Sequence, residues 1–306
     1  MFKKSVLMIA ALALAALIFV VPAWPGTLPT SIVPEGARWV AHLDMEKFVA
    51  SKLYEYLEKD GRLQIKNRDI GRWLKIDLFK DISGLTIFGL DSGDKQAVFA
   101  VTGKFDKAGL LALLALDKDY QAIPYGSNTL YLTGSDEFGA FINDGLIVFS
   151  ENRAAVETVL DTAAGKTKSF ASSKLNAAFK DVSSGVILSG VVEDLSGLGK
   201  EINQSKFVGK ASMMFFLAQE KQDNLQVRVQ VTADSPENAK NMADMAQGLI
   251  ALVRIGQGEG PGGIPASLVD GLRVKLEGKT VRLELDMPSQ EVANLASRGR
   301  GLDLFD

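Results

Sequence analysis

The tripeptide Asn143-Asp144-Gly145 lies between two short apolar runs, Phe138 to Ile142 and Leu146 to Phe149. Asn or Asp followed by Gly is typical of tight β-hairpins, because glycine readily adopts the positive φ that such turns need. The pair Glu277-Gly278 separates a second such couple of runs. Strands joined by hairpins are antiparallel, so the sequence excludes a doubly wound parallel sheet and predicts an α+β fold with helices packed on antiparallel strands.

A short β-rich run, a polar cap residue and a helix with apolar residues three or four apart follow one another six times. Asp, Ser or Asn before a helix accepts a hydrogen bond from one of its free backbone amides. Two looser strand pairs are expected, 85–90 with 97–102 and 213–218 with 225–231. The six expected strand and helix ranges are 39–43 with 44–57, 97–102 with 106–116, 146–149 with 150–164, 186–192 with 194–202, 225–231 with 234–255, and 281–285 with 289–297.

Residues 38–165 and 183–298 share the same order of elements, which predicts two similar modules. We expect the first module over 38–165, a connector over 166–182 and the second module over 183–306. In this alignment Asp44 matches Asp194, the helix of 106–116 matches that of 234–255, and the two Gly-containing hairpins match each other.

Sixteen apolar residues, Val6 to Val21, follow Lys3 and Lys4. This is the pattern of an export signal, and cleavage after Ala23 fits it. Counted through Trp24, the apolar stretch is also long enough to span a bilayer. Residues 1–24 are therefore predicted to be a signal peptide or a membrane anchor, and in both cases the rest of the chain is exported to the periplasm. Residues 25–37, rich in proline and glycine, are expected to form a tether.

The composition excludes several kinds of chemistry. The 306 residues carry a formal charge of −3, whereas a nucleic-acid-binding module needs a basic excess. Without cysteine the chain has no disulfide, thiol nucleophile or thiolate metal site, and its single histidine, His42, excludes any site that needs two histidines of one chain. We predict no cofactor, no metal and no catalytic residue.

His42 and Asp44 are two residues apart at the end of an expected strand, so they can face the same side and form a proton-transfer pair. The simpler interpretation is that Asp44 caps the following helix and that one nitrogen of His42 is hydrogen bonded. We favour it because no nucleophile elbow accompanies the pair. For a scattered group of acidic residues we expect solvated turns rather than a loose divalent-cation site; the group is Asp91, Asp94, Asp117, Asp119, Asp136 and Glu137.

Three further segments have simple structural interpretations. The basic and amphipathic stretch 62–80 indicates an ordinary helix, with a membrane or partner contact as the alternative. The glycines of 256–265 indicate a linker, because a phosphate-binding loop would need a strand before it and a helix after it. The apolar residues of the long helix are expected to lie in the core; they are Met242, Met245, Leu249, Leu252 and Val253.

Three segments together resemble a loosely defined group of exported bacterial proteins that carry a domain of unknown function. They are Pro34 to Asp44, Asp144 to Ser150 leading into a helix, and Gly165 to Phe179. The resemblance covers most of the exported chain and rests on apolar strands and cap residues. It implies an envelope location and a duplicated α+β build, and it implies no catalytic residues.

These observations predict a non-catalytic, exported or membrane-anchored envelope protein that acts as a binding or scaffolding component. Its partners would be the membrane, through residues 6–24 if they are not cleaved, and a protein or an apolar small molecule. The alternative is a carrier of an apolar, lipid-like ligand, which would need a large apolar cavity. A carboxylate- or metal-dependent hydrolase is the third hypothesis, and it would need two carboxyl groups held close together in a cleft.

Overall fold

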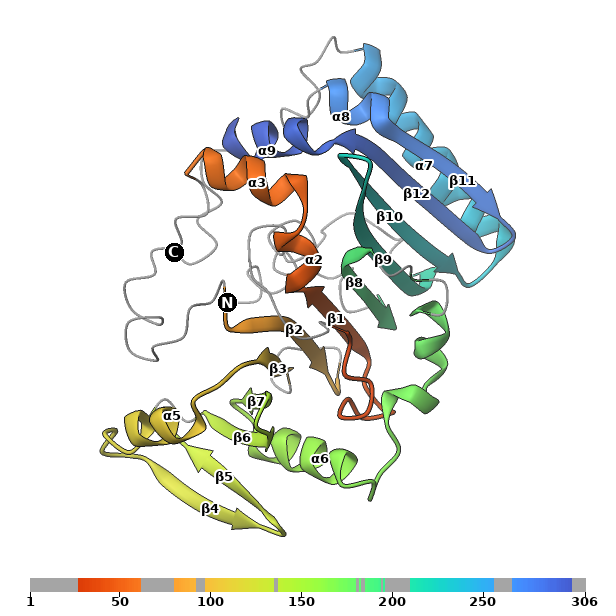
Figure 1. The fold of residues 1–306 in the computed structure, drawn as a ribbon. Coiled ribbons are helices and arrows are strands. Elements are labelled where there is room, and N and C mark those ends of the chain that lie inside the picture. The colour runs from red at the N-terminus through yellow and green to blue at the C-terminus, as the bar shows by residue number, and fades with distance from the viewer. Residues whose placement is uncertain are drawn as a thin grey trace. The chain divides into compact units, whose positions relative to one another are not determined.

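The computed structural model describes residues 27–61, 80–91, 97–134, 137–179, 182, 185–193, 195, 210–255 and 266–298. They belong to two compact units, whose elements are labelled in Figure 1. The N-terminal unit holds the described residues up to Ala50 and those from Leu57 to Val182. The C-terminal unit holds Ser51–Tyr56 and the described residues from Gly185 onward. Each unit contains antiparallel strands and helices, so the predicted mixture of α and β structure is confirmed.

The N-terminal unit is built on a sheet with the strand order β1-β2-β3-β7-β6-β5-β4, and the neighbours pair antiparallel. Phe88, Val98 and Val148 of its central strands are completely buried. Helix α6 packs on β3, β6 and β7. The strands are β1 (Trp39–Asp44), β2 (Ile82–Gly89), β3 (Ala97–Gly103), β4 (Gln121–Tyr125), β5 (Asn128–Leu132), β6 (Phe138–Asn143) and β7 (Leu146–Ser150). The helices are α2 (Met45–Val49), α5 (Lys107–Leu114), α6 (Arg153–Ala163) and the 3₁₀ turns η2 (Phe170–Ser172) and η3 (Lys174–Phe179).

The C-terminal unit is built on the strand order β8-β9-β10-β12-β11, again antiparallel throughout. Helix α7 packs on β10, β11 and β12, and α9 packs on β10 and β12. The strands are β8 (Val186–Glu193), β9 (Ala211–Lys221), β10 (Asn224–Ala233), β11 (Leu272–Glu277) and β12 (Thr280–Pro288). The helices are α7 (Pro236–Ile255), α8 (Ala266–Gly271), α9 (Ser289–Arg298) and the first five residues of α3 (Lys52–Lys59).

Polar caps start the helices as the sequence predicts. The Asp44 side chain accepts a hydrogen bond from the Lys47 amide in α2, and Asp106 caps α5 in the same way. The cap of α6 is Asn152 rather than Ser150. The helix expected over 44–57 is two helices, because Ser51 interrupts it and its Oγ accepts a hydrogen bond from the Tyr54 amide at 3.1 Å, which starts α3.

The expected hairpins β6–β7 and β11–β12 are both present. Gly278 has the predicted positive φ, +60°, whereas Gly145 is not among the residues with positive φ. At Gly145 the predicted reason for glycine is therefore wrong. A Cβ there would lie 3.2 Å from the Gly103 carbonyl oxygen, so a close approach of two backbones favours glycine instead.

Residues 25–37 were expected to form a tether, and from Ile32 onward this expectation is wrong. Ile32, Val33 and Ala37 are buried in the N-terminal unit. The Val33 carbonyl accepts a hydrogen bond from the Phe170 amide at 2.6 Å, in the part of the chain expected to be a connector. Burial of these apolar side chains together with Phe170 outweighs the proline and glycine content that suggested an unpacked segment.

Several predicted features lie outside the described residues: the apolar segment of 6–24, the basic stretch 62–79, the cap residue Asp194 and the glycine-rich stretch 256–265. Among the helices that the structure describes, none is both long and apolar enough to cross a bilayer.

Candidate functional site

His42 and Asp44 each have a structural partner. His42 is buried in β1, and its Nδ1 lies 2.8 Å from the Thr86 hydroxyl of β2, the residue directly opposite it in the sheet. The Asp44 carboxylate accepts the Lys47 amide at 3.0 Å, and burial raises the pKa of this carboxyl above its usual value. These contacts match the structural interpretation of the pair, in which Asp44 caps a helix and one nitrogen of His42 is hydrogen bonded.

Asp117 belongs to the scattered acidic residues that were expected to lie in solvated turns, and its carboxylate binds backbone amides. Its carboxylate accepts hydrogen bonds from the Asp119 amide at 2.9 Å and from the Gly134 amide at 3.0 Å. These backbone donors lower the pKa of the carboxyl. Asp117 therefore closes a surface loop. In the part of the chain that the structure describes, no three His, Asp or Glu side chains gather as metal ligands would.

The long helix α7 departs most from expectation. Its expected core stripe is split: Met242 is buried, but Met245, Leu249 and Leu252 are 43%, 56% and 61% exposed. These three residues, spaced by four and three positions, lie on one side of the helix and are called the apolar strip below. The spacing shows that a side of the helix is apolar, but it does not show whether other residues cover it. The prediction that these three residues are core residues is wrong.

Strand β11, on which α7 packs, also has apolar side chains on one face. Helix α7 packs on β11, whose apolar residues Leu272, Val274 and Leu276 lie opposite Leu285, Leu283 and Val281 of β12. Leu276 is itself 44% exposed. Large exposed apolar side chains that gather on one element indicate a binding surface more strongly than the same residues scattered singly.

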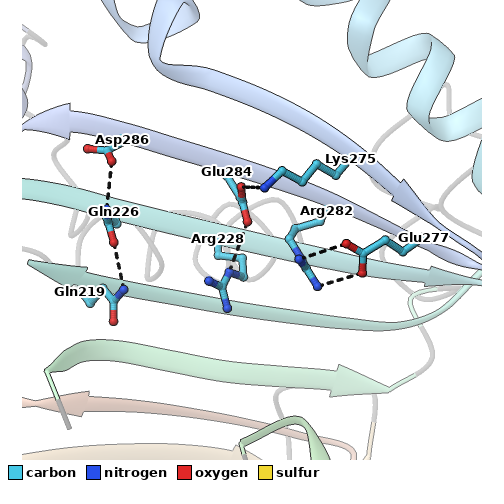
Figure 2. A network of polar contacts seen from close by, with 8 residues as sticks. All are labelled: Gln219, Gln226, Arg228, Lys275, Glu277, Arg282, Glu284 and Asp286. Atoms are coloured by element: carbon cyan, nitrogen blue, oxygen red, sulfur yellow. Dashed lines mark hydrogen bonds and ion pairs between the residues drawn. The ribbon is translucent and has the colours of Figure 1, made fainter. Parts of the chain in front are cut away.

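Polar side chains occupy the other side of β10, β11 and β12 (Figure 2). They arise from the alternation of polar and apolar residues along each strand, which places every second residue on the same face. The sequence shows this alternation, but the prediction identified none of these residues as a group, because their neighbours depend on β12 pairing with both β10 and β11. The residues drawn are Gln219, Gln226, Arg228, Lys275, Glu277, Arg282, Glu284 and Asp286.

The charges of this polar face are balanced by diagonal pairs. Lys275 lies directly opposite Arg282 in the register, an arrangement of like charges that is unfavourable. Lys275 Nζ instead lies 2.7 Å from Glu284 Oε2, and Arg282 donates two hydrogen bonds to Glu277, at 3.2 and 3.3 Å. The hydrogen bond from Lys275 lowers the pKa of Glu284.

The remaining groups of the polar face are also paired. The Asp286 carboxylate accepts hydrogen bonds from the side-chain amides of Asn224 and Gln226, both at 2.9 Å. Arg228 Nε lies 3.8 Å from Glu284 Oε1, an ion pair that is too long for a hydrogen bond. Each carboxylate of the polar face has a cationic or side-chain amide partner, so these contacts tie the strands together.

Glu220, near the end of β9, holds three parts of the C-terminal unit together. Its carboxylate accepts the backbone amides of Lys52 at 2.6 Å and Leu53 at 2.9 Å, at the start of α3. It also accepts the hydroxyl proton of Ser289, the fully buried first residue of α9. A carboxylate at a helix N-terminus satisfies amides that have no partner within the helix. No sequence motif indicates this contact, because its partners are 167 and 69 residues away.

Comparison with known proteins shows a fold likeness and nothing closer. The chain matches no protein-family model and no curated protein. It is similar to the structure of crystal form III of the protein TP0453, with a TM-score of 0.54 over 89% of this chain and 98% of the other at 9% identity. Crystal form I of the same protein gives a TM-score of 0.51 over 89% and 97% of the two chains at 10% identity. At this identity the likeness concerns the fold alone.

Proposed function

We propose that the protein is a non-catalytic, exported component of the cell envelope that binds a partner through the apolar strip of α7. The observation that carries the proposal is the exposure of Met245, Leu249 and Leu252 on one side of a helix that buries Ala239, Met242 and Ala243. Full burial of a large apolar side chain contributes roughly 1.5–3 kcal/mol, and a partner that covers these half-exposed residues can recover part of that amount at each. The proposal includes two similar modules, supported by the equal order of strands in the two units.

Export is supported by the lysine flank and apolar stretch at the start of the chain. A fusion of residues 1–37 to a reporter enzyme that needs disulfides tests it, because disulfides form outside the bacterial cytoplasm. We expect an active reporter. Replacing three of the leucines in 7–18 by arginine should abolish its activity. Equal activity of the two fusions would contradict export by this segment.

The binding surface is tested by a photo-crosslinking amino acid placed at Leu249 in the full chain in cells. The matched control is the same substitution at Leu116, which is 74% exposed but is a single apolar residue rather than part of the apolar strip. We expect a discrete adduct from position 249 and none from position 116. Indistinguishable patterns from the two positions would contradict a dedicated surface on α7.

A further inference from the structure

Strand β11 is the last strand of the described sheet of the C-terminal unit and packs against α7, the helix that carries the apolar strip. Within the described residues, β11 pairs with one strand, β12. Glu277 and Thr280 flank a two-residue turn and form a hydrogen-bonded pair. Along an antiparallel strand, the backbone N–H and C=O groups of successive residues point alternately toward the partner strand and away from it. Those of Leu272, Val274 and Leu276 therefore point to the outer edge. Such an edge is a template for another strand.

The corresponding strand of the N-terminal unit is covered. There β6 pairs with β5, and β5 pairs with β4. In β4, Pro124 lies opposite Thr129, next to the pair that flanks the turn. The backbone nitrogen of this position faces the outer edge of the sheet, and because proline has no N–H, no hydrogen bond can be donated from it. Proline on an edge strand prevents further pairing. The edge of β11 contains no proline and no irregularity of register with β12.

We infer that the β11 edge and the apolar strip of α7 together form an interface with a second copy of this chain, in which the two β11 strands pair antiparallel about a two-fold axis at Lys275. The inference rests on the proposed function and names the partner of the same surface. A two-fold axis makes the interface isologous, so β11 must be complementary to itself.

The sequence of β11 favours this register. An axis at Lys275 places Arg273 opposite Glu277 of the second copy and Val274 opposite Leu276, so that opposite charges and apolar residues meet twice. An axis at Val274 would place Arg273 opposite Lys275, which repeats an unfavourable pair of like charges. The two lysines at the axis are each neutralised within their own copy, since Lys275 Nζ lies 2.7 Å from Glu284 and points toward β12 (Figure 2).

The position of α7 agrees with this register. The helix packs on β11, β12 and β10, and most extensively on β11. A helix whose axis runs between β11 and β12 would lie about 10 Å from its symmetry mate, two strand spacings of about 4.8 Å. This is close to the usual distance between the axes of packed helices, about 8–10 Å. The second copy would thus supply both a strand for the open edge and a helix to cover exposed apolar side chains.

The absence of cysteine from the chain makes the register directly testable. Lys275 would form a pair without hydrogen bonds across the axis, with Cα atoms about 4.5 Å apart, within the range of a disulfide. We expect Lys275→Cys in the otherwise native full chain to form a disulfide-linked dimer under mild oxidation. In Arg273→Cys, the matched control on the same strand and face, the two cysteines would be roughly 13 Å apart and should not link.

A second measurement uses the chain without cysteine. We expect sedimentation to show a reversible dimer of the native chain, and Leu276→Glu to weaken it about tenfold or more, since the change affects two symmetric contacts. A Lys275→Cys variant that melts normally but links no more than Arg273→Cys would overturn the inference. If position 249 then still gives an adduct with a different protein, the proposed binding function stands and only the identity of the partner falls.

Discussion

The two units use the same strand order and end it differently. In the N-terminal unit the order β1-β2-β3-β7-β6 is followed by β5 and β4, whereas in the C-terminal unit the order β8-β9-β10-β12-β11 stops at β11. The helix that follows the third strand of each unit also differs in length: α5, after β3, has 8 residues, and α7, after β10, has 20. The extra hairpin of the N-terminal unit covers an edge, and the long helix of the C-terminal unit adds an exposed apolar side.

The two sheets therefore differ in whether their last strand is open to pairing with another strand. A sheet that ends in a short strand with Pro124 is protected against pairing with other chains. A sheet that ends in a regular strand beneath a partly uncovered helix can extend into a partner. The contrast lies in peripheral elements, while the interiors of both units are apolar and closely packed.

The largest expected effect comes from emptying the core of one unit at a time. Phe88 of β2 and Leu225 of β10 are almost completely buried. We expect Phe88→Ala to cost about 3–5 kcal/mol in the free energy of unfolding and Leu225→Ala about 2–5 kcal/mol, through lost burial and the cavity left behind. Denaturant unfolding measures both. Each variant should destabilise mainly the unit that contains it, as resolved by hydrogen exchange, and equal loss of protection in both units would break the comparison.

The next effect concerns the dependence of the C-terminal unit on Ser51–Tyr56, a segment far away in the sequence. We expect Glu220→Ala to cost about 1–3 kcal/mol, because two amides of α3 and the buried Ser289 lose their acceptor. Hydrogen exchange at Lys52 and Leu53 should accelerate. Glu237→Ala, at an exposed position in the first turn of α7, is the matched control and should leave both amides unchanged. Unaltered exchange in the Glu220 variant would show that the segment is held by apolar packing instead.

A smaller effect comes from the buried acid at the end of β1. Burial raises the pKa of Asp44 above its ordinary 3.8, so the native state holds this proton more tightly than the unfolded state. The contribution of the group to stability is therefore full below pH 3.8 and declines as pH rises through the raised pKa. Asp44→Asn keeps a cap acceptor without the charge. We expect the native chain to lose stability relative to this variant as pH rises from 3.8, and thermal unfolding at several pH values measures it. A constant difference would contradict the shift.

The smallest effect concerns the hairpin that distinguishes the N-terminal unit. Asp161 of α6 accepts hydrogen bonds from Lys166 at 2.7 Å and from the Tyr125 hydroxyl of β4 at 2.9 Å. These donors lower the pKa of Asp161, so its stabilising contribution is present above pH 3.8 and is lost as pH falls through the lowered value. We expect Asp161→Asn to lower the melting temperature slightly, and less at high salt, because the pair is exposed. The same loss in Glu151→Gln, an exposed control, would show a general effect of charge.

The strands and caps could be predicted from the sequence because their signals are local. Alternating residues and a glycine turn identified β11 and β12, and Asp44 and Asp106 begin helices as their chemistry suggests. The hairpin of β4 and β5 was not identified, since Pro124 interrupts the apolar pattern that marks a strand. Its turn does contain a glycine with positive φ, Gly126 at +58°.

The candidate surface was harder to predict, for a different reason. The apolar strip and the core side of α7 have the same spacing in the sequence, and the core side differs only in facing a sheet. That assignment needs the packing of α7 on β11 and β12, which is set by strand pairing across the whole unit. Val33 was missed in the same way, because its burial depends on Phe170, far along the chain.

The hydrogen bonds between Glu220 and the start of α3 also set an order of events during synthesis. Lys52 and Glu220 are 168 residues apart, and Ser289 follows Glu220 by a further 69. At roughly 5–20 residues per second, the start of α3 waits about 10–30 seconds for its carboxylate and longer for the completed contact. Over that interval the segment can nucleate a single helical turn at most, since short isolated helices are marginal in water. The segment Ser51–Tyr56 is therefore among the last described parts of the C-terminal unit to reach its final conformation.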